Sequence, residues 1–471
     1  MKGDEAIITA LHDSDVKVIT GVPGFPITKL IERIEQKEWC VNEKVALEIA
    51  LGSSVTGGRS AVITKHVGMN ILADSLVSSA THTIGAGVVI IAGDDPGALQ
   101  SQNEQDSRFY GLVAELPVFD PSTPEIAYKS ITHAFELSEK LGIPVIVRVT
   151  YRLMMMDGSI TRSKSFSSKS FDKKIWLFTM KGKHQRFHRS FSAMREYAEN
   201  SELNVYKKKA DIGIISSGYP SYLVDSMNVS HLSLGIINPL PINLINRFID
   251  EHDRIMVVEE TEPVIEIQIA GRVLGKLTGH VPYGIIELRD IKNAIHNIHK
   301  HSVTYDISPE TIEKRGARTL CQDCPYLPLY EAIKQLNVPV AGDMGCCILA
   351  SVPPLSMIDA AFSLGSAIST ASGFNKKGIA IIGDFGLAHS GICGLINAVY
   401  NKHDIVVVVL QNKVSAMTGG QKVADLTEII KTCVEDTEII YDFSNIKNII
   451  KNKLAKKGIS VILARARCPK Y

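Results

Sequence analysis

The residues from Gly383 to Gln421 constrain the fold of this chain more than any other segment. An apolar strand ends in Gly-Asp, a helix-like stretch follows, and a second apolar strand ends in Gln-Asn. In a parallel sheet the carboxyl ends of neighbouring strands lie together, so we expect Asp384 and Asn412, 28 residues apart, to reach one cation. A carboxylate, an amide oxygen and a backbone carbonyl near Val414 suit Mg²⁺. The pattern therefore predicts a magnesium diphosphate site.

Length and composition exclude several classes of protein. The chain has 471 residues, of which 45% are hydrophobic and 21% charged, as expected for a globular protein of about three domains. A net charge of +1 predicts no nucleic-acid or membrane partner. The amino terminus lacks the pattern of a signal peptide, and no apolar run reaches the roughly 18 residues of a membrane span. Eight cysteines without secretion signals favour the cytoplasm.

Strand-like runs alternate with helix-like segments along most of the chain. This alternation predicts an α/β fold of three tandem doubly wound domains with mostly parallel sheets. We expect the domains over residues 1–160, 209–300 and 310–471. Residues 161–208 are rich in Ser, Lys and Arg and are expected to form a linker, apart from a helical-looking segment around residues 191–199.

Several motifs resemble one enzyme family. The runs GDFG, HSGICGLINAVYN and LQNKVSAMTGGQ resemble the diphosphate-binding domain of the indolepyruvate ferredoxin oxidoreductase large subunit. NEKVALE at residues 42–48, KHVG at 65–68 and SQNEQDSR at 101–108 extend the likeness over nearly the whole chain. The resemblance implies the order pyrimidine-binding, transketolase C-terminal-like and diphosphate-binding domain. The family usually continues into a ferredoxin-like region with two iron–sulfur clusters, whereas this sequence stops at Tyr471.

The resemblance also implies the cofactors. Thiamine diphosphate suits the strand-end pattern better than ATP, and Mg²⁺ would be held by Asp384, Asn412 and the carbonyl of Val414. The residues expected to bind the cofactor are Glu43, Gly383, Asp384, Phe385, His389, Asn412, Val414, Thr418 and Gly419.

Thiamine chemistry requires a carboxylate that hydrogen-bonds the pyrimidine ring, so that the cofactor's own imino group can act as a base. Glu43 and Glu48 lie on the same predicted helix, about 140° apart around its axis, so both cannot face one ligand. Glu43 resembles the acidic position of thiamine enzymes, where small residues and then a glycine follow the glutamate. We therefore expect Glu43 to be the catalytic glutamate and Glu48 to be structural. The alternative is that Glu43 is a solvated glutamate in the first helical turn.

Four cysteines form a second candidate constellation. Cys321, Cys324, Cys346 and Cys468 fall in loops of the third domain that can converge in a doubly wound sheet. The resemblance suggests them as ligands of a [4Fe–4S] cluster beside the thiamine. Zinc, a purely structural role, and Cys347 in place of Cys346 remain alternatives.

The residues that contact the substrate are less well determined. His66 and His389 could donate to a carboxylate or enolate, and Arg108 could clamp a carboxylate, although each could equally be structural. Two residues depart from the family pattern. Phe25 stands where a small hydroxyl residue is usual, and Leu112 where relatives carry an arginine, and both changes remove a polar group from the expected 2-oxo acid pocket.

The resemblance implies oxidative decarboxylation of a 2-oxo acid of the arylpyruvate type, such as indolepyruvate, to an acyl-coenzyme A. Electrons would pass to ferredoxin or a separate iron–sulfur protein. A smaller partner subunit and an oligomer are also expected. Two alternatives stay open: a non-redox thiamine-dependent decarboxylase or lyase, and a catalytically reduced subunit that serves assembly, which Phe25 and Leu112 would favour.

Overall fold

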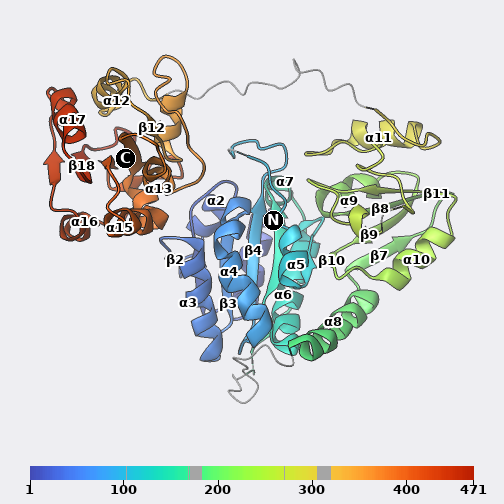
Figure 1. The fold of residues 1–471 in the computed structure, drawn as a ribbon. Coiled ribbons are helices and arrows are strands. Elements are labelled where there is room, and N and C mark those ends of the chain that lie inside the picture. The colour runs from blue at the N-terminus through green and yellow to red at the C-terminus, as the bar shows by residue number, and fades with distance from the viewer. Residues whose placement is uncertain (102, 168, 170–182, 270, 305–319) are drawn as a thin grey trace. The chain divides into compact units, whose positions relative to one another are not determined.

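The chain forms two compact units, Met1–Asp306 and Ile307–Tyr471, and each is described by itself (Figure 1). The computed structural model describes residues 1–101, 103–167, 169, 183–269, 271–304 and 320–471. No helix within these ranges is long and apolar enough to cross a bilayer.

The first sheet of the amino-terminal unit has the strand order β10-β5-β6-β4-β3-β1-β2. All neighbours pair in parallel except β10, which is antiparallel to β5. Its strands are β1 (Val18–Gly21), β2 (Glu38–Trp39), β3 (Ser60–Lys65), β4 (Val88–Asp94), β5 (Val118–Phe119), β6 (Val145–Thr150) and β10 (Ile236–Asn238).

Helices pack on both faces of this sheet. Ala61 and Ile63 of β3 share one core with α1, α2 and α6, whereas Val62 between them points to the opposite face. There α3 and α4 pack against each other and against β3. The Asn42 side chain caps α3 by accepting from the Val45 N–H at 2.9 Å. These helices and their neighbours are α1 (Gly3–Asp13), α2 (Thr28–Glu32), α3 (Glu43–Val55), α4 (His66–His82), α5 (Phe109–Ala114), α6 (Pro124–Leu141) and α7 (Tyr151–Met155).

A second sheet in the same unit has the order β11-β8-β9-β7, with β7 antiparallel to β9 and the other neighbours parallel. Its strands are β7 (Asn204–Lys207), β8 (Ile212–Ser217), β9 (Ser230–Leu234) and β11 (Arg254–Val258). The helical segments around it are α8 (Lys183–Asn200), α9 (Gly218–Asp225), α10 (Ile242–Asp250), η1 (Glu266–Gln268) and α11 (Leu288–His296).

The carboxyl-terminal unit contains a parallel sheet of order β12-β13-β14-β18-β17 and the small antiparallel pair β15 and β16. Its strands are β12 (Val340–Ala341), β13 (Gly378–Gly383), β14 (Ile405–Gln411), β15 (Val414–Ser415), β16 (Gln421–Lys422), β17 (Thr437–Ile440) and β18 (Ser460–Arg465). Its helical segments are α12 (Leu327–Lys334), η3 (Cys346–Ser351), α13 (Ala367–Ser372), α14 (Asp384–Gly386), η4 (Leu387–Gly391), α15 (Ile392–Tyr400), α16 (Thr427–Cys433) and α17 (Ile446–Ala455).

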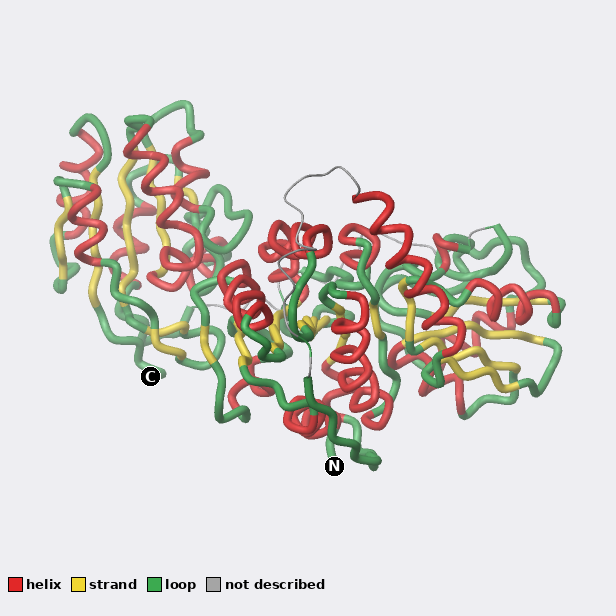
Figure 2. The backbone as a smooth tube through the Cα atoms, turned by 90° about the horizontal axis from the view of Figure 1, so that it is seen from below, coloured by secondary structure: helices red, strands yellow, loops and turns green. Residues whose placement is uncertain are grey.

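Strand residues of this unit alternate between two cores. Ile381 and Val408 pack in the core that includes α12 and α17, while Ile382 and Val407 pack in the core with α13, α15 and α16. A strand that is buried on both faces reads as a continuous apolar run, as β14 does. Figure 2 shows helices flanking the strands of the sheets. The predicted α/β class with mostly parallel, doubly wound sheets is confirmed.

The predicted division into three domains stays a prediction, and two features of the structure bear on it. β10 lies in the range expected for the second domain but completes the sheet of the first. The expected linker at 161–208 contains α8 and β7. Part of that linker, residues 170–182, lies outside the described residues, as does the expected start of the third domain at residue 310.

Arg108 does not have the role of a substrate clamp that its loop position suggested. It is completely buried, and its five N–H groups are all used. Nε and Nη2 donate to Asp106 at 2.9 and 2.6 Å, and Nη2 also donates to the Glu262 carbonyl at 2.8 Å. Nη1 donates to Glu259 at 2.9 Å and to Ser217 at 3.3 Å. No N–H donor is left for a substrate carboxylate.

This network joins the two sheets of the amino-terminal unit. Asp106 comes from the loop after β4, while Glu259 follows β11 of the second sheet. Burial raises the pKa of Asp106, but the charge of Arg108 outweighs burial and holds that pKa below its usual value. Arg148 on β6 forms a second fully buried pair with Asp94 at 2.7 Å. The arginines therefore neutralise acids that would otherwise be buried as uncompensated charges.

Replacing Arg108 by methionine should lower the free energy of unfolding by about 3–5 kcal/mol, because Asp106 and Glu259 would remain buried without their partner. Chemical denaturation of the full chain measures this. Arg289→Met on the exposed face of α11 is the control and should leave stability nearly unchanged. If Arg108→Met is as stable as the wild type and only its substrate affinity is reduced, Arg108 is a substrate clamp after all.

Candidate active site

The carboxyl edge of the third sheet brings Asp384 and Asn412 together. β13 and β14 pair with Gly383 opposite Leu410, so their ends are level. Asp384 Oδ2 accepts from the backbone N–H of Lys413, the residue after Asn412, at 2.6 Å. Asn412 Oδ1 accepts from the Val414 N–H at 3.0 Å, which orders the turn that follows. The two oxygen donors therefore stand on adjoining, hydrogen-bonded turns.

Asp384 is 7% exposed, and burial raises its pKa to about 6. Backbone N–H groups, first that of Lys413 and then that of Phe385, oppose the shift but do not cancel it. A carboxylate whose charged form is disfavoured by burial is stabilised when a cation binds beside it. Asp384 thus has both the position and the electrostatics of a cation ligand.

The turn after β14 closes on glycines. Gly419 and Gly420 have φ angles of 128° and 81°, in the left-handed region that favours glycine. Thr418 Oγ1 donates to Gln421 Oε1 at 2.9 Å, across the turn between β15 and β16. The tail Thr-Gly-Gly-Gln is therefore a hairpin turn, with Thr418 and Gly419 at its tip.

His389 lies in η4, a π-helical turn that directly follows the Asp384 turn. Its side chain is buried, its Nδ1 is 3.2 Å from Ser390 Oγ, and its ring centroid is 6.3 Å from that of Phe385. Single π turns within helices occur frequently at functional sites. The structure thus places Phe385 on the same turn as Asp384, and His389 on the turn that follows.

Asp343 is a residue of this region to which the sequence analysis assigned no role. It is fully buried, its Oδ1 accepts from the Gly365 N–H at 2.7 Å, and its Oδ2 has no hydrogen-bond partner among the residues described. Burial raises its pKa to about 7. A Cβ added to Gly386 would overlap Asp343 Oδ2, so this carboxyl group packs directly against the α14 turn. The sequence signal was a second Gly-Asp pair after a strand, at residues 342–343.

The four candidate cysteines lie in one region of the carboxyl-terminal unit. Burial raises the pKa of Cys346 to about 11, and the neighbouring thiols of Cys324, Cys468 and Cys321 act in the same direction. All four are free thiols. The described residues nevertheless contain no group of three or more His, Cys, Asp or Glu side chains in a metal-binding arrangement.

The neighbouring Cys347 differs from Cys346. It is 2% exposed and packs in the hydrophobic core with Tyr330. After burial, the groups that raise its pKa include Asp343 and Cys346 but none of the other candidate cysteines. The structure therefore favours Cys346 over Cys347 as a member of the thiol group.

In the amino-terminal unit, Glu43 is the first residue of α3, close to the carboxyl end of β2. It is 5% exposed, so it is not a solvated glutamate. A Cβ added to Gly68 of α4 would overlap the Glu43 carboxylate and Thr64, which shows how closely α4 approaches this side chain. Glu48 is exposed and bonds to Ser75 at 2.8 Å. The structure thus separates a buried glutamate from a surface glutamate on one helix.

His66 begins α4 at the carboxyl end of β3, along the same sheet edge as Glu43. It is fully buried, and neither ring nitrogen has a hydrogen-bond partner in the described part of the chain. Burial lowers its pKa, the charge of Lys65 adds to that shift, and the charges of Asp94 and Asp95 oppose it only in part. The imidazole is therefore neutral near pH 7.

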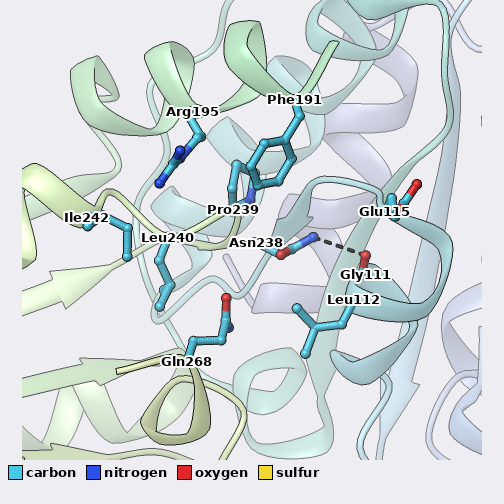
Figure 3. Close-up of a pocket in the computed structure, with 10 residues that line it drawn as sticks. All are labelled: Gly111, Leu112, Glu115, Phe191, Arg195, Asn238, Pro239, Leu240, Ile242 and Gln268. Carbon is cyan, nitrogen blue, oxygen red and sulfur yellow. Dashed lines mark hydrogen bonds between the residues drawn. The ribbon is translucent and has the colours of Figure 1, made fainter. Parts of the chain in front are cut away.

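Neither residue that departs from the family pattern contributes a polar group here. The Phe25 ring packs against that of Tyr151, with centroids 5.2 Å apart. Leu112 lines a cavity of about 330 Å³ between α5, α8 and the segment after β10 (Figure 3). That cavity lies beside Asn238, which pairs with Val118, the first residue of β5. The expectation that Leu112 belongs to the 2-oxo acid pocket is therefore not supported, because the cavity lies at the amino edge of the sheet that carries Glu43 on its carboxyl edge.

Comparison with known proteins identifies the family. Residues 1–111 match the thiamine pyrophosphate enzyme N-terminal TPP binding domain, and residues 343–461 match the C-terminal TPP binding domain. Indolepyruvate oxidoreductase subunit IorA from Methanothermobacter thermautotrophicus is 33% identical over 99% of this chain and 86% of that protein. Sulfopyruvate decarboxylase subunit alpha from Methanocaldococcus jannaschii is 29% identical over 31% of this chain and 91% of that protein.

A solved 2-oxoglutarate:ferredoxin oxidoreductase from Magnetococcus marinus aligns with a TM-score of 0.47 and 14% identity. The alignment covers 58% of this chain and 61% of that structure. The identity to the IorA relatives extends over nearly all of this chain. The chain belongs to the indolepyruvate ferredoxin oxidoreductase alpha-subunit family of thiamine diphosphate-dependent oxidoreductases.

Proposed function

We propose that this protein is the catalytic subunit that oxidatively decarboxylates an arylpyruvate, such as indolepyruvate, to an acyl-coenzyme A and passes the electrons to ferredoxin. A smaller subunit would be its partner. This substrate is supported by similarity, over nearly the whole chain, to subunits that are named for indolepyruvate. The observation that carries the chemistry is the pair of adjoining turns that holds Asp384 and Asn412 at one sheet edge.

Thiamine diphosphate, when bound, supplies the carbon nucleophile and the electron sink for decarboxylation. Asp384, Asn412 and the Val414 carbonyl would hold Mg²⁺ on its diphosphate, and the Thr418–Gly419 turn would contact the phosphates. The buried Asp384 charge and the unpaired Asp343 oxygen support a cationic or hydrogen-bonding occupant at this edge.

Glu43 would form a hydrogen bond with the pyrimidine ring and exchange a proton with it. Its burial supports this role, because a carboxyl group screened from water transfers a proton to a bound partner more readily than to solvent. The neutral His66, on the same sheet edge, would donate a hydrogen bond to a substrate oxygen through one of its unpaired nitrogens. His389 would act beside the diphosphate, at the sheet edge that carries Asp384.

Cys321, Cys324, Cys346 and Cys468 would ligate a [4Fe–4S] cluster that accepts electrons singly. The support is that the other three thiols, after burial, contribute to the raised pKa of Cys346. Binding of iron would reverse that effect, because thiolates are stabilised by a metal cation.

The second candidate is a non-redox decarboxylase. It is favoured by the similarity of about a third of the chain to a subunit named sulfopyruvate decarboxylase. The two reactions differ in the fate of the electrons, since only the oxidative reaction requires an acceptor.

The discriminating experiment uses anaerobically purified protein with its partner subunit, thiamine diphosphate, Mg²⁺ and indolepyruvate. We expect CO₂ release to depend on coenzyme A and a one-electron dye, with two dye molecules reduced per CO₂. Iron and acid-labile sulfide should be present, and Cys346→Ser should lower both, whereas Cys433→Ser on α16 should not. Release of CO₂ with an aldehyde product and without an acceptor would establish the non-redox reaction instead.

Glu43→Gln should slow hydrogen–deuterium exchange at C2 of bound thiamine diphosphate by about 100-fold or more, because the amide cannot exchange a proton with the ring. Proton NMR of the quenched cofactor measures the rate. Glu48→Gln on the same helix is the matched control and should exchange at the wild-type rate. Equal exchange rates in both variants would exclude Glu43 as the catalytic glutamate.

Asp384→Asn should weaken Mg²⁺-dependent retention of thiamine diphosphate by about tenfold or more. In the wild type, binding of Mg²⁺ must displace the proton of a carboxyl group whose pKa is about 6, so the apparent Mg²⁺ affinity should fall about tenfold per pH unit below pH 6 and stay level above it. Mg²⁺ titrations followed by cofactor fluorescence quenching test both effects. Asp404→Asn, at the amino end of β14, is the control, and a flat pH profile in the wild type would contradict the assignment.

A further inference from the structure

The cavity beside Leu112 is separate from the candidate active site. α5 provides Gly111 and Leu112, α8 provides Phe191 and Arg195, and the chain after β10 closes the cavity from the other side (Figure 3). Its volume of about 330 Å³ is at the lower end of the range for small-molecule sites. All of its lining belongs to the amino-terminal unit.

One wall of the cavity carries a positive charge. Arg195 directs its guanidinium group toward the cavity in Figure 3, 5.5 Å from the centroid of the Phe191 ring. Arg195 is exposed, and among the described residues its recorded contact is the Phe191 ring rather than a carboxylate. A planar guanidinium that is held by a ring and lacks an acidic partner suits a carboxylate, which it can bind through two hydrogen bonds.

The opposite wall presents two amide oxygens. The Asn238 Nδ2 donates to the carbonyls of Gly111 at 3.0 Å and Leu116 at 2.6 Å, and its Oδ1 faces the cavity. The Gln268 Nε2 donates to the Val264 carbonyl at 2.9 Å, and its Oε1 likewise points inward. Because their N–H groups are engaged, these side chains are fixed as acceptors, which require a donor on the ligand.

Between the charged wall and the acceptor wall the lining is apolar. Leu112, Leu240 and the Phe191 ring provide this surface, while the carboxylate of Glu115 points away from the cavity in Figure 3. A ligand that matches all three parts has a carboxylate, an N–H donor and an apolar body. We propose that this cavity is a second small-molecule site, which binds an amino acid with an apolar side chain.

In this arrangement the α-carboxylate pairs with Arg195, the α-ammonium donates to Asn238 Oδ1 and Gln268 Oε1, and the side chain packs on Leu112 and Leu240. The site lies at the amino edge of the first sheet, whereas Glu43 and His66 lie at its carboxyl edge. This site is independent of the proposed reaction and of its 2-oxo acid.

Calorimetric titration of the full chain with L-phenylalanine and L-leucine tests the proposal. At least one of them should bind, and for the phenylalanine series 3-phenylpropionate, without the ammonium, and 2-phenylethylamine, without the carboxylate, should each bind at least about tenfold more weakly. Absence of binding by both amino acids overturns the proposal. Equally tight binding of 3-phenylpropionate also overturns it, because the acceptor wall would then play no part.

Two variants assign binding to this cavity. Arg195→Gln should weaken amino-acid binding at least about tenfold, and Arg289→Gln on α11 should leave it unchanged. Leu112→Trp should abolish binding by filling the cavity, with the circular dichroism spectrum unchanged. Wild-type affinity in Arg195→Gln or in Leu112→Trp would overturn the assignment. Thiamine diphosphate binding, measured on the same samples, should be unaffected by these variants. Cofactor binding therefore tests the proposed function, and amino-acid binding tests this site.

Discussion

The register between β13 and β14 is the constraint on which the candidate diphosphate site depends. With Gly383 opposite Leu410, the two strands end level, and the Asp384 carboxylate reaches the backbone after Asn412. A shift of one residue would turn every side chain of β14 to the other face of the sheet. Since both faces are buried in separate cores, such a shift would misplace Val407 and Val408 together, and packing thus fixes the position of the polar turn.

Among the residues described, several ionisable side chains at this edge of the sheet are buried without a positive charge that offsets the cost of burial. Asp384 and Asp343 have raised pKa values because they are removed from water, and the thiol of Cys346 is affected in the same way, with further contributions from neighbouring cysteines. Each of these groups gains stability when a cation binds beside it. In the amino-terminal unit, Arg108 pairs with Asp106 and holds the pKa of that carboxyl group below its usual value. Arg148 pairs with Asp94, although burial still raises the pKa of Asp94.

Arg108 shows the limit of reasoning from a motif. An arginine in a polar loop after a strand suits a substrate clamp, and the sequence contains no sign that Glu259, 151 residues away, occupies its donors. Leu112 is similar, since its place in the chain pointed to the substrate pocket, whereas α5 carries it toward the opposite sheet edge. The Arg108 difference arises because Ser217 and Glu259, at the ends of strands of the second sheet, accept its hydrogen bonds. The Leu112 difference arises because α5 leads into β5, whose first residue lies at the amino edge of the sheet.

The sequence by itself determined the α/β class and the adjacency of Asp384 and Asn412, because these follow from local periodicity and from the rule that parallel strands end at one edge. Its motifs pointed to the family by resemblance. The helical angle between Glu43 and Glu48 showed that both cannot face one ligand, and the resemblance of Glu43 to the acidic position of thiamine enzymes decided between them. Only the tertiary structure decided that Arg108 is structural, that Asp343 lies against the Asp384 turn, and that Leu112 lines a separate cavity. These features depend on contacts between segments distant along the chain, and such contacts leave no periodic signal in the sequence.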